Sequence, residues 1–497
     1  GAYADADAYA VSVERVGSSG GLFNDGADPD LAETETPTSS FQSIVVDNTI
    51  INSGSIIGVY GSSIRIGGSV ATTDSSVAGN RIELAAPAFL GGDIYLNDND
   101  GNNDVGATEV EITTGPSHSV LWHMTGNMYE FGEDAPIEIN TNGVPVWVLE
   151  GEDDYVFATF DPTVIAAAPQ QFSDVQNLVQ NALRGNSADN TGTGAFAVVR
   201  SSEKGYEGNE TSTLAHTTDQ TVSLAGLNLA AANGISGQVY LGQADSTSTA
   251  SSLFTESFTR ELDATVAGAN LFVPVANARF EFGLGGGRSD VSVSRFVNAN
   301  IADNGCIDDA DGDCGVTLGQ AWANGETYAT WTAPSLGVSG VFALSESVSV
   351  RPSARATYMQ GSIDGYTETT SYVDTNGDAI DVATIGEQKF SMLETDLGLS
   401  FTKVVSKSVS VSFGGGVVNQ TFKSGADVEV TMYDDNADLV SAATQDVSQR
   451  TENTQIPYIS GGLAFTQEKF TVELLGRAAK YNGDVKTSLG AQIRFDF

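Results

Sequence analysis

The chain has 497 residues and carries 64 Asp and Glu against 22 Lys and Arg, which gives a formal net charge of −42. Nucleic-acid phosphates repel such a polyanion, so the composition argues against nucleic-acid binding. Nowhere does an apolar run approach the roughly 18 residues of a membrane-spanning helix, so crossing a membrane would require strands of alternating pattern. The sequence is already patterned at Gly1, which we interpret as an artificial or processed start that interrupts a longer chain.

The first part of the chain, residues 1–151, contains short apolar segments separated by Gly, Asn, Asp and Ser. Examples are "NTIINSGSIIG", "SSIRIGGSV", "NRIELAAPAFLGGDIYLN" and "ATEVEITTG". Segments that recur at roughly twenty residues are typical of a parallel β-helix, in which each coil covers the apolar face of its neighbour. The pattern therefore predicts the end of a right-handed parallel β-helix.

A helix is predicted in the segment that follows, residues 152–191. Within "FSDVQNLVQNALRG" the apolar side chains recur at helical spacing: Val175, Leu178, Val179, Ala182 and Leu183. Ser173 and Gln176 have the spacing of a capping box, and Gly185 suits a helix end. The prediction is a helix over about residues 172–184.

From residue 192 to residue 497 the sequence alternates apolar and polar residues in twelve segments, from "AFAVVR" to "SLGAQIRFDF". The connections after the even-numbered segments are short, whereas most of those after the odd-numbered segments are long, polar and acidic. Short turns at one rim and long loops at the other are typical of an outer-membrane barrel, and a soluble sandwich has no reason to alternate them. The sequence thus predicts an all-β fold with a 12-stranded antiparallel transmembrane β-barrel.

Charged residues in these segments share a face that lies opposite apolar residues. Glu394 and Asp396, for example, oppose Leu393, Leu397 and Leu399. Lipid cannot solvate a charge, so a membrane barrel must direct such side chains into its lumen. The predicted lumen charges are Arg351, Arg355, Glu394, Asp396, Glu473 and Arg477. A soluble barrel or sandwich with an inverted polar core is the alternative.

The lumen of a barrel of about twelve strands should admit one helix, whose diameter with side chains is roughly 10–12 Å. Because the predicted helix directly precedes the first barrel strand, we expect it inside the pore. Its polar residues would then face the lumen charges: Ser173, Gln176, Asn177, Gln180, Asn181 and Arg184. The alternative is a short helix packed across the periplasmic mouth.

Two features of the acidic loops are candidate stabilising sites. Cys306 and Cys314 could close a small disulfide loop in an oxidising compartment, with free thiols as the alternative. Three acidic stretches resemble calcium loops, in which alternating Asp or Asn oxygens and a turn Gly wrap a hard cation; solvated loops are the alternative, because none has the closing Glu. The candidate Ca²⁺ ligands are Asp98, Asp100, Asp104, Asp309, Asp311, Asp313, Asp374, Asn376 and Asp378.

The sequence ends on "GAQIRFDF", a segment with two different faces. Leu489, Ala491, Ile493, Phe495 and Phe497 share one face, and polar or small residues share the other. This alternation predicts a final strand with one apolar side and one wet side. We expect it to pair with the first barrel strand and to place its terminal aromatic residue in a girdle at the membrane interface.

The order of β-helix end, linker, helix, twelve strands and terminal Phe resembles the classical autotransporters of Gram-negative bacteria (type V secretion). The resemblance implies that residues 1–151 are the C-terminal part of a passenger and that residues 192–497 are its translocator barrel. It implies a barrel in contact with outer-membrane lipid, through which the passenger threads outward to fold outside the cell. It also implies that the barrel-assembly machinery reads the last strand, here through Ile493, Phe495 and Phe497.

Some autotransporters cut themselves in the lumen at paired Asn residues. This linker offers only isolated ones, so that activity is not carried over. Other motifs make no case for an enzyme. "GSSGG" at residues 17–21 lacks the strand and the helix of a nucleophile elbow, and "GLGGG" at residues 283–287 lies in a predicted strand, where glycines allow bending or close packing. His118 and His123 would lie on opposite faces of a strand.

The predicted function is that of a translocator and anchor, which exports its own N-terminal part and displays it on the cell surface. An adhesin-like passenger that faces a host or a neighbouring cell is the expected task of the exported part. A porin-like diffusion channel with an N-terminal plug or surface domain is the first alternative. An exported hydrolase whose active site lies upstream of Gly1 is the second.

Overall fold

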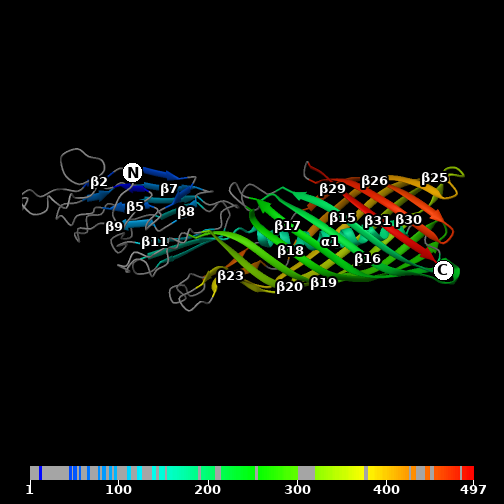
Figure 1. The fold of residues 1–497 in the computed structure, drawn as a ribbon, viewed down its shortest axis with the longest axis horizontal. Coiled ribbons are helices and arrows are strands. Elements are labelled where there is room, and N and C mark those ends of the chain that lie inside the picture. The colour runs from blue at the N-terminus through cyan, green and yellow to red at the C-terminus, as the bar shows by residue number, and fades with distance from the viewer. Residues whose placement is uncertain are drawn as a thin grey trace, which may run out of the picture.

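The computed structural model describes twelve short strands between Val11 and Asn140 and most of the chain after them. The later described residues are 145–150, 154–187, 192–207, 214–251, 256–299, 320–373, 379–424, 427–432, 443–447, 453–481 and 484–497. The first part consists of short strands, and the second consists of a helix and the long strands of a barrel (Figure 1).

Twelve long strands form an antiparallel barrel in which each pairs with its neighbours along the chain. Sequence alternation explains these strands, since they place apolar residues at every second position over part of their length. They are β15 (Gly194–Tyr206), β16 (His216–Ala230), β17 (Ser236–Ser251), β18 (Glu256–Val275), β19 (Ala278–Ala299), β20 (Gln320–Gly340), β22 (Val348–Ile363), β25 (Gln388–Ser406), β26 (Val409–Ser424), β29 (Asn453–Gln467), β30 (Phe470–Tyr481) and β31 (Asp484–Asp496).

The barrel closes between its first and last strands. β15 pairs with β31 from Gly194 opposite Asp496 to Ser202 opposite Ser488. The backbone N–H of Phe497 donates to the carbonyl of Thr193 over 2.9 Å, which extends this seam to the end of the sequence. Closure gives every one of these strands two partners, as a lipid environment requires of a sheet. The predicted twelve-stranded antiparallel barrel is confirmed.

The outer surface of the barrel is apolar, whereas its interior combines polar and charged side chains with a buried hydrophobic cluster. On β25, Leu397 and Leu399 are 52% and 45% exposed, while Glu394 and Asp396 are 4% and 3% exposed. The same alternation continues to the final strand, where Ile493, Phe495 and Phe497 point outward with 41%, 50% and 76% exposure. An apolar outer surface of this kind is suited to lipid rather than to water.

The two rims of the barrel differ. At the short-turn rim, β18 and β19, β25 and β26, and β29 and β30 are joined by tight turns, and β16 leads to β17 through the 3₁₀ turn Ala232–Gly234. At the opposite rim, called the long-loop rim here, two hairpins rise beyond the barrel strands: β23 (Tyr366–Val373) with β24 (Ala379–Ile385), and β27 (Val428–Met432) with β28 (Ala443–Val447). The rhythm of connections predicted from the sequence is present in the described residues.

The strands before the helix pair mainly in parallel. One four-stranded sheet contains β3 (Thr49–Asn52), β7 (Arg81–Ala85), β10 (Glu109–Thr113) and β12 (Ile137–Asn140). Ile50 pairs with Ile82, Ile82 with Val110, and Val110 with Ile137, so the steps between coils exceed the spacing read from the sequence. Most side chains of these strands lie outside the described residues, and the right-handed β-helix therefore stays a prediction.

The glycines of "GLGGG" make room inside the barrel. A Cβ on Gly287 would lie 2.5 Å from the indole of Trp331, and one on Gly285 would lie 2.5 Å from the hydroxyl of Tyr240. These positions of β19 thus lack side chains because aromatic groups from β20 and β17 occupy the lumen there. The expected role in close packing agrees with this geometry.

Candidate functional site

The interior of the barrel is occupied by the helix α1 (Thr163–Ser187), whose residues are buried along nearly its whole described length (Figure 1). The prediction of a helix inside the pore is confirmed, and the position across the periplasmic mouth is wrong. The helix begins near the long-loop rim and continues toward the short-turn rim, where β15 starts. The polypeptide therefore passes through the lumen before it enters the barrel wall.

The helix begins about two turns earlier than the predicted residue 172. Its N-cap is Asp161, whose Oδ1 accepts a hydrogen bond of 2.8 Å from the backbone N–H of Thr163. Ser173 is not a cap, because it lies in the middle of the helix. Its hydroxyl instead lies 2.9 Å from the sulfur of Met392 and accepts a hydrogen bond from Gln420. The helix ends at Ser187 rather than at Gly185.

Pro169 lies inside the helix and explains the wrong start. Proline has no N–H, so the carbonyl four residues earlier, that of Ile165, loses its helical partner. The barrel wall replaces this partner, because the side-chain amide of Gln388 donates to the Ile165 carbonyl over 2.8 Å. The carbonyl of Val164 accepts a hydrogen bond from Arg260 in the same way. The wall thus stabilises a helix that its own sequence would interrupt.

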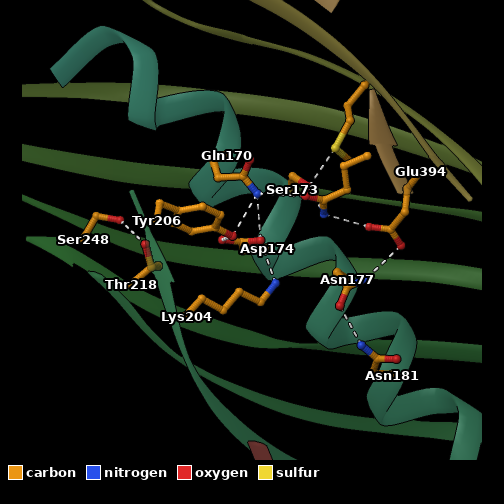
Figure 2. Close-up of polar contacts among 12 residues, drawn as sticks. Gln170, Ser173, Asp174, Asn177, Asn181, Lys204, Tyr206, Thr218, Ser248 and Glu394 are labelled. Carbon is orange, nitrogen blue, oxygen red and sulfur yellow. Dashed lines mark hydrogen bonds and ion pairs between the residues drawn. The ribbon is translucent and has the colours of Figure 1, made fainter. Parts of the chain in front are cut away.

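A buried polar cluster fixes the middle of the helix (Figure 2). Asp174 is fully buried, with one carboxylate oxygen 2.6 Å from the Lys204 ammonium and the other 2.5 Å from the Tyr206 hydroxyl. Gln170 donates to the same hydroxyl over 2.9 Å. Both wall residues belong to β15, so the cluster connects the helix directly to the first strand of the barrel.

One turn further on, amide side chains of the helix contact three strands. Asn177 donates to Glu394 over 2.8 Å (Figure 2), and the oxygen of Gln176 accepts from the indole N–H of Trp331 over 3.0 Å. The oxygen of Gln180 accepts from Arg355 over 3.2 Å and from Thr357 over 3.1 Å. These contacts hold one side of the helix against the adjacent strands β20, β22 and β25.

The last turns of the helix contact charged groups. Arg477 donates to the side-chain oxygen of Asn181 over 2.8 Å, and Arg184 forms an ion pair with Asp396. Tyr458 donates to the other oxygen of Asp396 over 3.0 Å, and Arg200 donates to the backbone carbonyl of Asn181 over 3.0 Å. The charged side chains of the wall at this level are therefore paired with charged or hydrogen-bonding groups of the helix, and not with water alone.

The structure places the predicted lumen charges on the inner face of the barrel. Four of them, Arg355, Glu394, Asp396 and Arg477, contact the helix as described above. Arg351 and Glu473 instead line a cavity of about 340 Å³ between the end of the helix and the short-turn rim, called the vestibule here. The arginines that line it are Arg184, Arg200, Arg279, Arg351, Arg355, Arg477 and Arg494.

Several interior residues escaped the sequence analysis. Asp174, Lys204 and Tyr206 were not assigned a role, and neither was the aromatic pair formed by Phe172 and Trp331, whose ring centroids lie 5.4 Å apart. A signal was present in the first strand, where Arg200, Ser202, Lys204 and Tyr206 occupy every second position and so share one face.

The long-loop end of the lumen contains a second buried ion pair. Arg295 lies 2.6 Å from Glu368, both side chains are fully buried, and the guanidinium lies 4.5 Å from the ring of Phe160. Asp161 is the next residue in the chain after Phe160. Burial raises the pKa of Asp161 to about 7, although its hydrogen bonds to Thr163 and the charge of Arg295 oppose the shift. The first turn of the helix is thus capped by a carboxyl group, that of Asp161, whose pKa lies near neutral pH.

Other predictions fall outside the described residues. They are the disulfide of Cys306 with Cys314 and the calcium ligands Asp98, Asp100, Asp104, Asp309, Asp311, Asp313, Asp374, Asn376 and Asp378. Both stay predictions. In the ranges that the structure does describe, no group of three or more His, Cys, Asp or Glu is placed to hold a metal ion. No helix in those ranges is both long and apolar enough to span a membrane.

Together, fold and site define a closed twelve-stranded β-barrel that is plugged by the helix preceding its first strand. No protein-family model matches the sequence, and no curated protein matches it in a sequence comparison. Solved structures that are similar to this chain include three parts of autotransporters. The translocator domain of NalP from Neisseria meningitidis has a TM-score of 0.48 and 13% identity, and the match covers 67% of this chain and 99% of that chain.

The two other structures share less of the geometry. The β domain of the Bordetella autotransporter Brka has a TM-score of 0.38 and 14% identity, over 62% of this chain and 100% of that chain. The transport unit of the autotransporter AIDA-I from Escherichia coli has a TM-score of 0.38 and 14% identity, over 66% and 99% of the two chains.

Proposed function

We infer that this protein is an outer-membrane translocator and anchor of the autotransporter type, which exports its own N-terminal part and displays it on the cell surface. The observation that supports this is the path of the chain. The segment before Thr163 lies at the long-loop rim, the helix fills the lumen, and the wall begins with Gly194 at the opposite rim. A chain that is threaded through its own barrel in this way is what export through that barrel would leave behind.

The anchoring role follows from the contacts of the helix. Ion pairs and hydrogen bonds from eight strands hold α1, among them Lys204 with Asp174 and Asp396 with Arg184. Buried ionic groups that lose one partner are costly, so withdrawal of the helix is strongly opposed. The N-terminal part would therefore remain attached at the surface for as long as the linker is uncut.

Several further roles belong to this proposal. The exported part is an adhesin-like surface structure that contacts a host or a neighbouring cell, and the chain itself carries no catalytic function. The barrel contacts outer-membrane lipid through its apolar outer surface. The barrel-assembly machinery recognises the last strand, where Ile493, Phe495 and Phe497 are exposed on that surface.

Surface labelling tests the proposal. An epitope placed within residues 1–40 should be accessible to antibody on intact Gram-negative cells that express the chain. A variant that lacks residues 484–497 cannot close the barrel, and its epitope should be accessible only after lysis. Equal labelling of the intact and the truncated protein would contradict the proposal, as would an epitope of the intact protein that stays hidden until lysis.

A porin-like diffusion channel is the alternative, and conductance separates the two functions. The helix-filled lumen predicts that the purified protein is nearly closed in planar bilayers. Deletion of residues 172–185 should open it, because those residues supply most of the contacts across the lumen. A large steady conductance of the intact protein would favour the channel.

A further inference from the structure

The vestibule has a strongly basic lining, although the protein as a whole is strongly acidic. Seven arginines line it, which is half of the 14 arginines in the sequence, against three carboxylates. The whole chain, in contrast, carries a net charge of −42. Cationic groups have therefore been concentrated at the short-turn end of the lumen, below the last turn of the helix.

Six of these arginines come from strands of the wall and Arg184 comes from the helix, and several are held in place by neighbouring side chains. Arg279 stacks over Phe272 at 3.9 Å and Arg477 over Tyr458 at 3.6 Å. Arg494 lies 3.2 Å from Asp496, a fourth nearby carboxylate. Even with this partner counted, guanidinium groups outnumber carboxylates. Charge enclosed by low-dielectric walls produces a strong local potential, here positive.

The N-terminal part of the chain has the opposite character. Residues 1–162 contain 26 Asp and Glu, three Arg and no Lys. Guanidinium groups bind carboxylates in short, charge-assisted hydrogen bonds, and an unfolded acidic segment can present its carboxylates one after another. The vestibule thus fits a polyanionic polypeptide, and this chain contains one.

We propose that the vestibule is a receiving site for acidic segments of the chain's own N-terminal part as they enter the barrel from the short-turn rim. The proposal rests on the proposed export function. It adds that the recognition is electrostatic and that it uses the arginines of the vestibule. Arg279 and Arg351 are chosen as probes, because they line the vestibule from two different wall strands, β19 and β22.

A binding measurement tests the proposal without export. The probe is a labelled peptide of residues 129–154, which carries eight Asp or Glu and no Lys or Arg, and its analogue has amides at those eight positions. Full-length protein in detergent micelles should bind the acidic peptide about tenfold more tightly than the analogue, with an affinity that falls as salt rises. R279Q/R351Q should lose this preference, and R279K/R351K should keep it.

The matched control is K403Q/K407Q, which removes two exposed charges from the outside of the same rim. This control should bind like the wild type, and the heat-modifiable mobility of each variant on gels verifies that its barrel is closed. Equal affinity for both peptides, or an equal loss in the control, would overturn the proposal. Binding of inorganic phosphate without binding of the acidic peptide would replace it with a small-anion site.

Export supplies a second readout that separates this proposal from the export function. If the wild-type epitope reaches the surface, R279Q/R351Q should slow its appearance in a pulse-chase experiment, and a passenger with Asp and Glu changed to amides should show no such slowing. Equal slowing of both passengers would overturn the electrostatic proposal alone. A wild-type epitope that never reaches the surface would overturn the export function, while the peptide measurement would still stand.

Discussion

Asp174 places a carboxylate in the middle of the lumen, against Lys204 and Tyr206 of the first barrel strand. The side chains of Asp174 and Lys204 are 0% and 5% exposed, so neither can recover its solvation if the other is removed. The pair also carries the contact between the helix and the strand that follows it. Its energetic role is therefore to fix one arrangement of the helix rather than to add general stability.

Asp174→Ala should leave the buried Lys204 ammonium without its ionic partner and destabilise the helix in the lumen by roughly 3–5 kcal/mol. The expected result is a lower denaturant midpoint for helix release, measured by fluorescence of a probe at the short-turn rim. The matched double variant Asp174→Ala with Lys204→Met removes both charges and should recover much of the loss. A double variant that is as unstable as the sum of its single changes would contradict a direct pairing.

At the scale of single residues, the sequence predicts well which side chains point into the lumen. It predicts less well which partners those side chains contact. The sequence places Glu394 and Asp396 in the interior because they alternate with Leu393 and Leu397. Successive side chains of a strand point to opposite faces, so this alternation alone determines which of them face the lumen. The partner of each charge depends on the rotation and height of the helix, which no local pattern encodes. Asp174 was consequently passed over, although it makes the shortest contacts in the middle of the helix.

Among the elements, α1 depends on the wall for its own hydrogen bonding. Gln388 donates to the Ile165 carbonyl that Pro169 leaves without a helical N–H. Wall and helix therefore form one hydrogen-bonded structure at this point. A helix folded alone would be interrupted there.

Gln388→Leu should leave the Ile165 carbonyl buried without that donor and cost about 1–3 kcal/mol in helix docking. The control is Pro169→Ala, which restores a backbone N–H at the correct position. In that background Gln388→Leu should cost much less. Hydrogen exchange of the helix amides provides the measurement, and equal costs in both backgrounds would show that the amide of Gln388 does not replace the missing helical bond.

The titration of Asp161 should make the first turn of the helix sensitive to pH. The pKa of this carboxyl is raised from 3.8 to about 7 by burial, so between these values only the native state retains the proton. Stability of the first turn is then greatest below pH about 4, falls as pH rises to about 7, and stays low above it.

Asp161→Asn preserves a capping side chain but cannot titrate. Hydrogen exchange, corrected for its intrinsic pH dependence, should show the first turn opening more readily as pH rises from 4 to 7 in the wild type. The variant should show a flat profile over the same range. Identical profiles in the two proteins would contradict the assignment of the pH dependence to Asp161.

The sequence carries only part of the signal for the start of the helix. Asp161 followed by Pro162 matches a cap residue and a first-turn proline, but Pro169 interrupts the helical pattern, so the continuous apolar spacing begins only near Phe172. What extends the helix to Thr163 is tertiary, namely the donors on β18 and β25 that satisfy its carbonyls. The remaining course of the helix followed from its apolar spacing.

At the scale of the whole molecule, the lumen of the barrel is filled by a helix of the same chain. Its barrel was predictable because twelve alternating segments, unequal connections and an aromatic last strand all favour the same closed ring. The N-terminal part was less predictable, since its short strands pair in parallel at steps that vary from coil to coil. The charge distribution of the interior, with arginines gathered at one end, emerges only once the strands are placed side by side.

The central claim is that the surface-displayed protein has its helix seated in the lumen, and cysteine cross-linking on intact cells tests it most directly. In a background with Cys306 and Cys314 changed to Ser, Asn177→Cys and Glu394→Cys place thiols on two residues whose native side-chain tips lie 2.8 Å apart, within reach of a short bifunctional thiol reagent. We predict that the reagent joins them in molecules whose N-terminal epitope is accessible outside. A helix that stays uncross-linked in the surface-labelled molecules would contradict the account.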